Sequence, residues 1–330
     1  VQEEAEEVQI NMSGRSMIRV RSPESYLEEL PDIFKVIRSQ EDSVYTCPDY
    51  LSEEFQQKQR DEVSMNPNLY FPSGMSTSTA SSCTGINEVW REKICEWCYQ
   101  VVDHFDYNRQ VVSIALNYLD RYLALRPVNR KIFQLAAMTC LFLAIKLNET
   151  RPLSLPAFLS LSRGYFQADH VLKMEHAILR ALQWRMNPPT ALVQAKHLMF
   201  VLPRHVQRKS EILEITRFLT EISVCDYFFV SQKLSTVALA ALYSSFDIIG
   251  NSCVSEADKI YFESEVRRLT GLESVTDDVL ACMTRMKHSF QQSGFTLSTF
   301  DSPNDKGRPE DGGNSSPVCV ADVKSLESAN

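Results

Sequence analysis

Glycine is scarce in this sequence, which has 10 glycines among 330 residues against a usual share of about 7%. A chain with few glycines forms few tight turns, which favours helices over many short strands. Catalytic motifs are also missing: no phosphate-binding or dinucleotide-binding glycine loop, no HExxH zinc motif and no GxSxG nucleophile motif occur. We therefore expect an all-α protein that is not an enzyme and uses no cofactor.

Positive charge is limited too, because the formal net charge is −8 and the densest basic stretch is only RHVQRK, residues 204–209. This argues against nucleic-acid binding through a broad phosphate footprint. The apolar segment 132–147 is too short, and too polar at Gln134 and Thr139, for a convincing membrane span. The sequence predicts a soluble, intracellular protein that binds neither nucleic acid nor membrane.

The nine cysteines are scattered and odd in number, which fits free thiols in a reducing compartment better than a disulfide framework. Cys95 and Cys98 form a single CxxC motif. Zinc would need two more ligands at matching spacing, and a redox motif would follow a strand. The six histidines form no ligand cluster, so we expect no metal site and interpret Cys95 and Cys98 as buried thiols.

Helical periodicity dominates the chain from Asn87 onward. Asn108, Asn129 and Ser154 are placed to cap helices. Five helices are expected in each of two successive regions. Their approximate ranges are 87–105, 109–125, 130–148, 155–162 and 168–183, followed by 191–201, 209–228, 232–248, 256–270 and 276–292.

The third helix of each set has a polar start and an Ala/Leu-rich body, as in RKIFQLAAMTCLFLA and SQKLSTVALAALYSSF. A helix that is apolar on nearly every side is enclosed by its neighbours. Each half is therefore predicted to pack four helices around a central third. The predicted regions are a disordered acidic N-terminus (1–29), an N-terminal helix region (30–64), a flexible linker (65–86), two helical domains (87–186 and 187–292) and a disordered tail (293–330).

Arg91 and Asp120 form a candidate ion pair. Asp120 lies between apolar Leu119 and Leu123 on a helix that carries a core face. A buried carboxylate needs a partner, and a bidentate arginine suits it best. The alternative is a surface acid beside Arg121.

Lys146 closes the enclosed helix, and Glu175 borders the core face of a later one. That helix has an apolar stripe formed by Val171, Leu172, Met174, Ile178, Leu179 and Leu182. Taken alone, Lys146 is explained by the preference of cations for helix C-termini, and Glu175 by a solvated edge or a local pair.

The motifs WREKICEW, NYLDRYL, LAIKLNET and MEHAIL follow one another in this order. This succession resembles the cyclin box over roughly residues 87–186, and residues 187–291 look like a second, more divergent box. The segment DIFKVIRSQEDSVY (32–45) resembles the helix that precedes the first box in cell-cycle cyclins. FLAIKLNETRPLS is most similar to D-type cyclins, whereas the N-terminal helix has mitotic A/B-type character.

The resemblance implies a non-catalytic subunit that binds and activates a cyclin-dependent serine/threonine kinase. Lys146 and Glu175 match the residues that bind the partner kinase at its αC helix, and Arg91 and Asp120 match a structural ion pair. Weaker candidates for kinase contact are Phe105, Leu147, Phe158 and Leu179. A role in cell-cycle control in the nucleus and cytoplasm follows.

The resemblance also implies a substrate-docking or inhibitor-docking patch on the first helix of the box. Its positions map to Trp90, Ile94, Trp97, Gln100, Phe133 and Gln134. Trp90 replaces a methionine and Gln100 an acidic residue, which weakens the case for docking an arginine-containing motif.

The Ser/Asp/Pro-rich tail holds Ser302-Pro303 and Ser316-Pro317. It resembles a degradation-prone segment in which Ser302 and Ser316 are candidate phosphosites and a ubiquitin ligase is the expected partner. An inert tail is the alternative.

Two alternative functions are considered. One is a transcription-type cyclin. The other is a DNA-binding module like the B-type general transcription factor, which would need a zinc ribbon and a basic surface.

Overall fold

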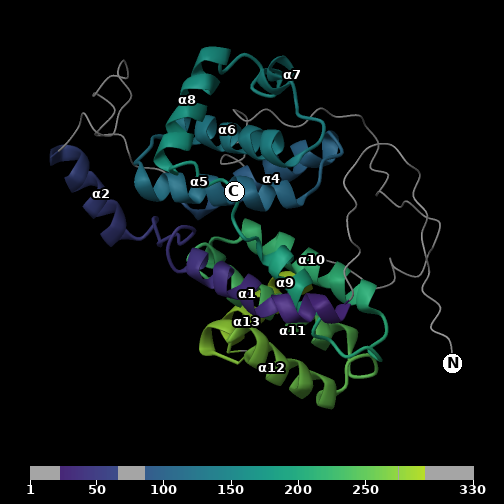
Figure 1. The fold of residues 1–330 in the computed structure, drawn as a ribbon. Helices are drawn as coiled ribbons and strands as arrows, with labels where there is room; N and C mark the ends of the chain where they lie inside the picture. Colours follow the sequence, from purple (N-terminus) through teal and green to yellow (C-terminus); the bar gives the residue numbers. More distant parts are fainter. Residues whose placement is uncertain (1–22, 66–85, 274, 294–330) are drawn as a thin grey trace.

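The computed structural model describes residues 23–65, 86–273 and 275–293, and the part described is helical without β-strands (Figure 1). The predicted all-α fold with two five-helix units is confirmed. The helices of the first unit, here called the first box, are α4 (Glu88–His104), α5 (Gln110–Leu125), α6 (Arg130–Asn148), α7 (Leu155–Ser160) and α8 (Ala168–Ala181). The second box contains α9 (Ala191–Met199), α10 (Lys209–Cys225), α11 (Leu234–Ile249), α12 (Glu256–Thr270) and α13 (Asp277–Gln292).

In the first box α6 is the central helix, since every residue from Phe133 to Ile145 is buried. It packs against α4, α5 and α8, and Phe142 stacks on Phe158 of α7 with ring centroids 4.5 Å apart. The side chain of Asn129 caps the helix at Ile132 N, as its sequence position predicts. By length and composition α6 could cross a membrane, but 72% of its apolar window is buried inside the molecule.

The second box repeats this plan around α11, which contacts α9, α10 and α13 and reaches α12 through the Phe246–Phe262 ring contact. One expected helix, 209–228, is shorter than predicted. It ends at Cys225, and a 3₁₀ turn at Tyr227–Phe229 follows after Asp226, whose side chain accepts from Phe228 N.

The N-terminal helix α1 (Pro23–Glu41) begins seven residues before the predicted region at 30, so residues 23–29 are helical rather than disordered. Proline fixes φ and lacks an N–H, so it suits the first helical position, where that N–H has no partner. α1 lies along the second box, whereas the next helix, α2 (Glu53–Met65), lies beside the first (Figure 1). Most of the predicted linker (65–86) and tail (293–330) lies outside the described residues, namely 66–85 and 294–330.

Candidate protein-docking site

Lys146 and Glu175 contact each other directly. The Lys146 Nζ atom lies 2.6 Å from Oε1 of Glu175 and 5.1 Å from the centre of the Phe142 ring. The second oxygen, Oε2 of Glu175, is buried and has no hydrogen-bond partner in the part of the chain described. A buried carboxylate oxygen without a donor is costly, so a rotation of the Glu175 carboxylate that turns this oxygen toward a donor on a binding partner would relieve the cost.

Lys146 lies in the last turn of α6, where a cation suits the negative end of the helix dipole, but its hydrogen bond goes to another helix. The Asn148 side chain donates to Ala144 O at 2.8 Å and so satisfies a carbonyl in the last turn of α6. Lys146 is in that same last turn, but its Nζ extends to α8 instead. The ammonium group therefore remains near the surface with N–H donors to spare.

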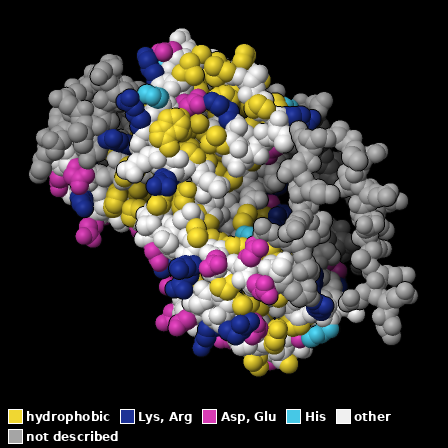
Figure 2. All heavy atoms as spheres, viewed as in Figure 1, with side chains coloured by type: hydrophobic (Ala, Val, Ile, Leu, Met, Phe, Trp, Pro, Cys, Tyr) yellow, Lys and Arg dark blue, Asp and Glu magenta, His cyan; other side chains and the backbone are white. Residues whose placement is uncertain are grey.

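Exposed apolar side chains flank this pair. Leu147 is 56% exposed, and Leu172, one helical turn before Glu175, is 53% exposed. The assignment of Leu172 to the buried stripe of its helix was therefore wrong. On the face shown in Figure 2, hydrophobic side chains gather over the first box, and charged side chains are more frequent over the second.

Two of the weaker kinase-contact candidates are placed differently from expectation. Phe158 is fully buried against Phe142, and Leu179 is buried in the core of the first box. Both contribute to packing in the core of the first box, and their role in kinase contact stays a prediction. Phe105 is partly buried at the end of α4 and, with the exposed Leu147, remains a candidate. Lys146, Leu147, Leu172 and Glu175 form what we call the docking surface.

Arg91 and Asp120 form the predicted bidentate pair. Arg91 Nε donates to Oδ1 and Nη2 to Oδ2 of Asp120, both at 2.8 Å, and both side chains are buried. Desolvation lowers the pKa of Arg91, but the charge of Asp120 outweighs it and raises the pKa well above its ordinary value. Sequence analysis missed Tyr50, whose hydroxyl donates to Asp120 Oδ1 at 2.8 Å from a segment 70 residues away.

Arg91 also reaches the second box. Its Nη1 donates to Val224 O at 2.8 Å and to Cys225 O at 3.2 Å, where α10 ends and carbonyls lack intrahelical partners. Two turns further along α4, the Tyr99 hydroxyl donates to Glu221 O. We call this line of contact between α4 and α10 the seam. No local sequence pattern predicted it.

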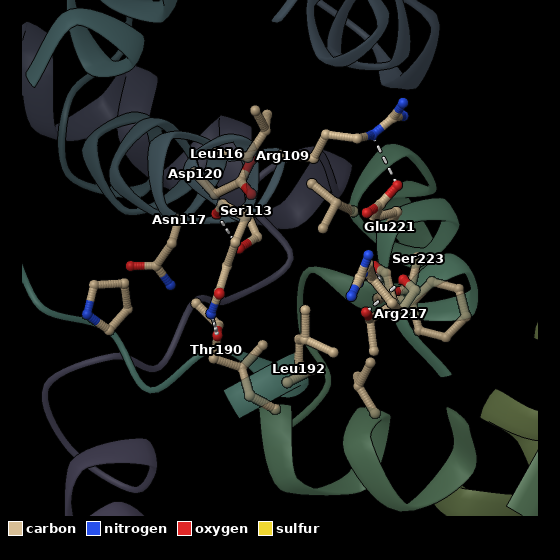
Figure 3. A pocket seen from close by; sticks show the side chains of 18 of the residues that line it. Arg109, Ser113, Leu116, Asn117, Asp120, Thr190, Leu192, Arg217, Glu221 and Ser223 are labelled. Atoms are coloured by element: carbon tan, nitrogen blue, oxygen red, sulfur yellow. Dashed lines mark hydrogen bonds and ion pairs between the residues drawn. The ribbon is translucent and has the colours of Figure 1, made fainter. Parts of the chain in front are cut away.

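A cavity of about 490 Å³ lies beside the seam, between the two boxes (Figure 3). Arg109 and Glu221 form an ion pair of 2.9 Å at its edge, and burial raises the pKa of the Glu221 carboxyl. Gln110 donates to the Thr190 hydroxyl, and this hydrogen bond joins α5 to the start of α9. Polar side chains and apolar ones such as Leu192 share the cavity lining.

The predicted docking patch on α4 is mostly enclosed. Five of its members are buried, and Gln100 alone is exposed. Trp90 packs edge-on to Phe133, with ring centroids 6.4 Å apart. The buried members are Trp90, Ile94, Trp97, Phe133 and Gln134. The docking role of this patch stays a prediction.

Ser302 and Ser316 lie outside the described residues, so their role also stays a prediction. Within the described ranges, no three His, Cys, Asp or Glu side chains are grouped so as to hold a metal ion. Cys95 and Cys98 are both buried free thiols, as interpreted from sequence.

Known proteins resemble this chain in sequence. Human G1/S-specific cyclin-D1 is 26% identical over 155 residues, 47% of this chain and 52% of the human protein. G2/mitotic-specific cyclin-2 of Medicago sativa is 32% identical over 164 residues, 48% of each protein. The chain thus spans about half the length of these curated relatives.

Solved structures share the fold. A viral cyclin from herpesvirus saimiri matches with a TM-score of 0.53 at 15% identity, over 71% of this chain and 97% of that one. The CAK complex of Chaetomium thermophilum bound to ATP-gamma-S matches with a TM-score of 0.51 at 14% identity, over 78% of this chain and 80% of that one.

Family models divide the chain at the junction of the two boxes. The cyclin N-terminal domain matches residues 70–187, which include α4–α8, and the cyclin C-terminal domain matches residues 189–302, which include α9–α13. Both domains are present, in order and over most of the chain, and the chain belongs to the cyclin family.

Proposed function

We propose that this cyclin is the non-catalytic regulatory subunit of a cyclin-dependent serine/threonine kinase and acts in cell-cycle progression. The observation that carries the proposal is the Lys146–Glu175 pair, which combines spare N–H donors with an unpartnered carboxylate oxygen between exposed leucines. Charged groups of this kind satisfy the free backbone groups at a helix end.

The partner helix is the αC helix of the kinase. Lys146 donates to carbonyls that lack partners at its terminus, and Glu175 accepts from free N–H groups nearby. Leu147, Leu172 and Phe105 supply apolar contact around them. Holding αC inward completes the Lys–Glu pair that phosphoryl transfer requires, so a cyclin that binds only this arrangement shifts the kinase population toward activity.

The test is co-purification and kinase assay with candidate cyclin-dependent kinases, using wild type, Lys146→Ala, Glu175→Ala and the double variant. Truncating one member of an interfacial charge pair weakens binding by at least about tenfold. Lys173→Ala is the matched control, since Lys173 forms an exposed ion pair with Asp169 on the same helix. Failure of wild type to retain any kinase, or full activation by the double variant, contradicts the proposal.

The remaining predictions are proposed as regulation of the same subunit. Phosphorylation at Ser302 and Ser316 recruits a ubiquitin ligase, and alanine at both positions lengthens the half-life of the protein in cells. The protein is present in both nucleus and cytoplasm, which imaging of a fluorescent fusion checks.

Substrates or inhibitors dock on the α4 patch. Gln100 is the exposed member of this patch, so Gln100→Ala weakens their capture but not kinase binding.

A further inference from the structure

Two thiols meet at the seam between the boxes. The Sγ atoms of Cys95, in the middle of α4, and Cys225, the last residue of α10, are 3.1 Å apart. Among the described residues, Cys98, which completes the CxxC motif, has no thiol contact of this kind. The partner of Cys95 is therefore a residue 130 positions later in the chain and in the other box.

Hydrogen bonds of the seam on either side of these thiols keep the two sulfur atoms facing each other. Arg91, Cys95 and Tyr99 follow one another at intervals of four on one face of α4. Arg91 donates to the carbonyl of Cys225 itself, and Tyr99 donates to Glu221 O one turn before it. The sulfur atoms thus face each other between two hydrogen-bonded positions, and only a small approach separates contact from a covalent bond.

We propose that Cys95 and Cys225 form a reversible disulfide that links the two boxes when the protein meets a hydroperoxide. With hydrogen peroxide, the Cys225 sulfur attacks one peroxide oxygen, the O–O bond breaks, and the departing hydroxide takes the Cys225 proton, which gives a sulfenic acid and one water. The sulfur of Cys95 then attacks the sulfenic sulfur, and the departing hydroxide takes the Cys95 proton as a second water. Two electrons pass from the thiol pair to one peroxide molecule. A dithiol reductant then reduces the disulfide back to two thiols.

The surroundings favour Cys225 as the attacking sulfur. It is partly exposed, whereas Cys95 is fully buried. The hydrogen bond from the Cys95 thiol and the charge of Arg91 lower the pKa of Cys225, although desolvation opposes them. Burial raises the pKa of Cys95 well above its usual value, so Cys95 resolves the sulfenic acid rather than forming it.

The test treats the purified full-length chain with hydrogen peroxide, blocks free thiols and maps non-reduced peptides by mass spectrometry. The expected product is an intramolecular Cys95–Cys225 peptide pair that is lost on reduction. Because the bond closes a loop of about 130 residues, the oxidised protein melts higher than the reduced one by roughly 5 °C or more.

Two variants separate this pair from other thiols. Cys225→Ser changes a partly exposed residue, so it keeps the fold while abolishing both the linked peptide and the melting shift. Cys253→Ser is the matched control, because Cys253 is also partly exposed but contacts Arg208 and Ser252, away from the seam. Three results overturn the proposal: Cys225 links to Cys98 or to a second chain, oxidised Cys225 accumulates without a link, or the melting temperature does not change.

Discussion

A single guanidinium joins three elements of this cyclin. Arg91 on α4 uses two of its N–H groups on Asp120 of α5 and a third on the carbonyls that end α10. Its planar group provides five donors in a fixed fork, and a lysine in its place would have three donors on one atom. The residue therefore sets the position of α5 within the first box and of the first box against the second.

The charge of Asp120 balances this arrangement, so its removal leaves Arg91 buried and partly unpaired. We expect Asp120→Ala to lower the free energy of unfolding by about 3–5 kcal/mol. Urea titration followed by circular dichroism measures the loss. Asp169→Ala provides the comparison, because Asp169 is 67% exposed beside Lys173 and such pairs contribute at most about 1 kcal/mol. A similar small change for both variants contradicts the buried-pair interpretation.

At the scale of elements, α1 supplies side chains that form hydrogen bonds with backbone groups at the ends of two helices in the second box. Arg38 donates to Thr270 O and Gly271 O where α12 ends. Glu41 accepts from Ser235 N at the start of α11, where the N-cap residue Lys233 supplies no side-chain hydrogen bond. Each charge is matched to the dipole of the helix end it meets. Gly271 ends α12 with φ +65°, a left-handed backbone conformation that glycine adopts without strain.

Glu41 predicts a pH dependence. Burial raises its pKa above the ordinary 4.5, against hydrogen bonds from Gln194 and Ser235. The folded state therefore binds this proton more tightly than the unfolded state. The resulting stabilisation is fully present below about pH 4.5 and is lost as the pH rises through the folded pKa.

Urea unfolding of wild type and Glu41→Gln between pH 4.5 and 7 isolates this contribution. Wild type should gain stability relative to the variant as the pH falls. A difference between the two proteins that stays constant, or that shifts against wild type on acidification, contradicts the assignment.

Elements with a local signal were predictable from sequence, and contacts between distant segments were not. The apolar body around Met138 and the cap at Asn129 predicted α6, because periodicity and capping act over a few residues. The Arg91–Asp120 pair was also predictable, because it joins two helices that follow each other in the chain. The contacts of Tyr50 with Asp120 and of Cys95 with Cys225 bring together residues 70 and 130 positions apart, and nothing in their neighbourhoods specifies the partner.

At the scale of the whole molecule, the N-terminal segment ties the boxes together. Leu30 and Phe34 of α1 are buried in the core of the second box, and Cys47 and Tyr50 are buried in that of the first. The Tyr227 hydroxyl, just after α10, donates to Asp49. The segment is thus a strap whose two ends belong to different cores, so the second box depends on residues that precede the first.

Phe34→Ala tests this dependence. Phe34 is fully buried, and truncating a buried phenylalanine costs about 3–5 kcal/mol. Val36→Ala, on the same helix at 56% exposure, should change stability by no more than about 0.5 kcal/mol. Hydrogen exchange should locate the loss, with α11 and α12 less protected in the phenylalanine variant and α6 nearly unchanged. Equal loss in α6 and α11 would mean that the strap stabilises the boxes as one unit, and no loss in either would mean that α1 is dispensable to the second core.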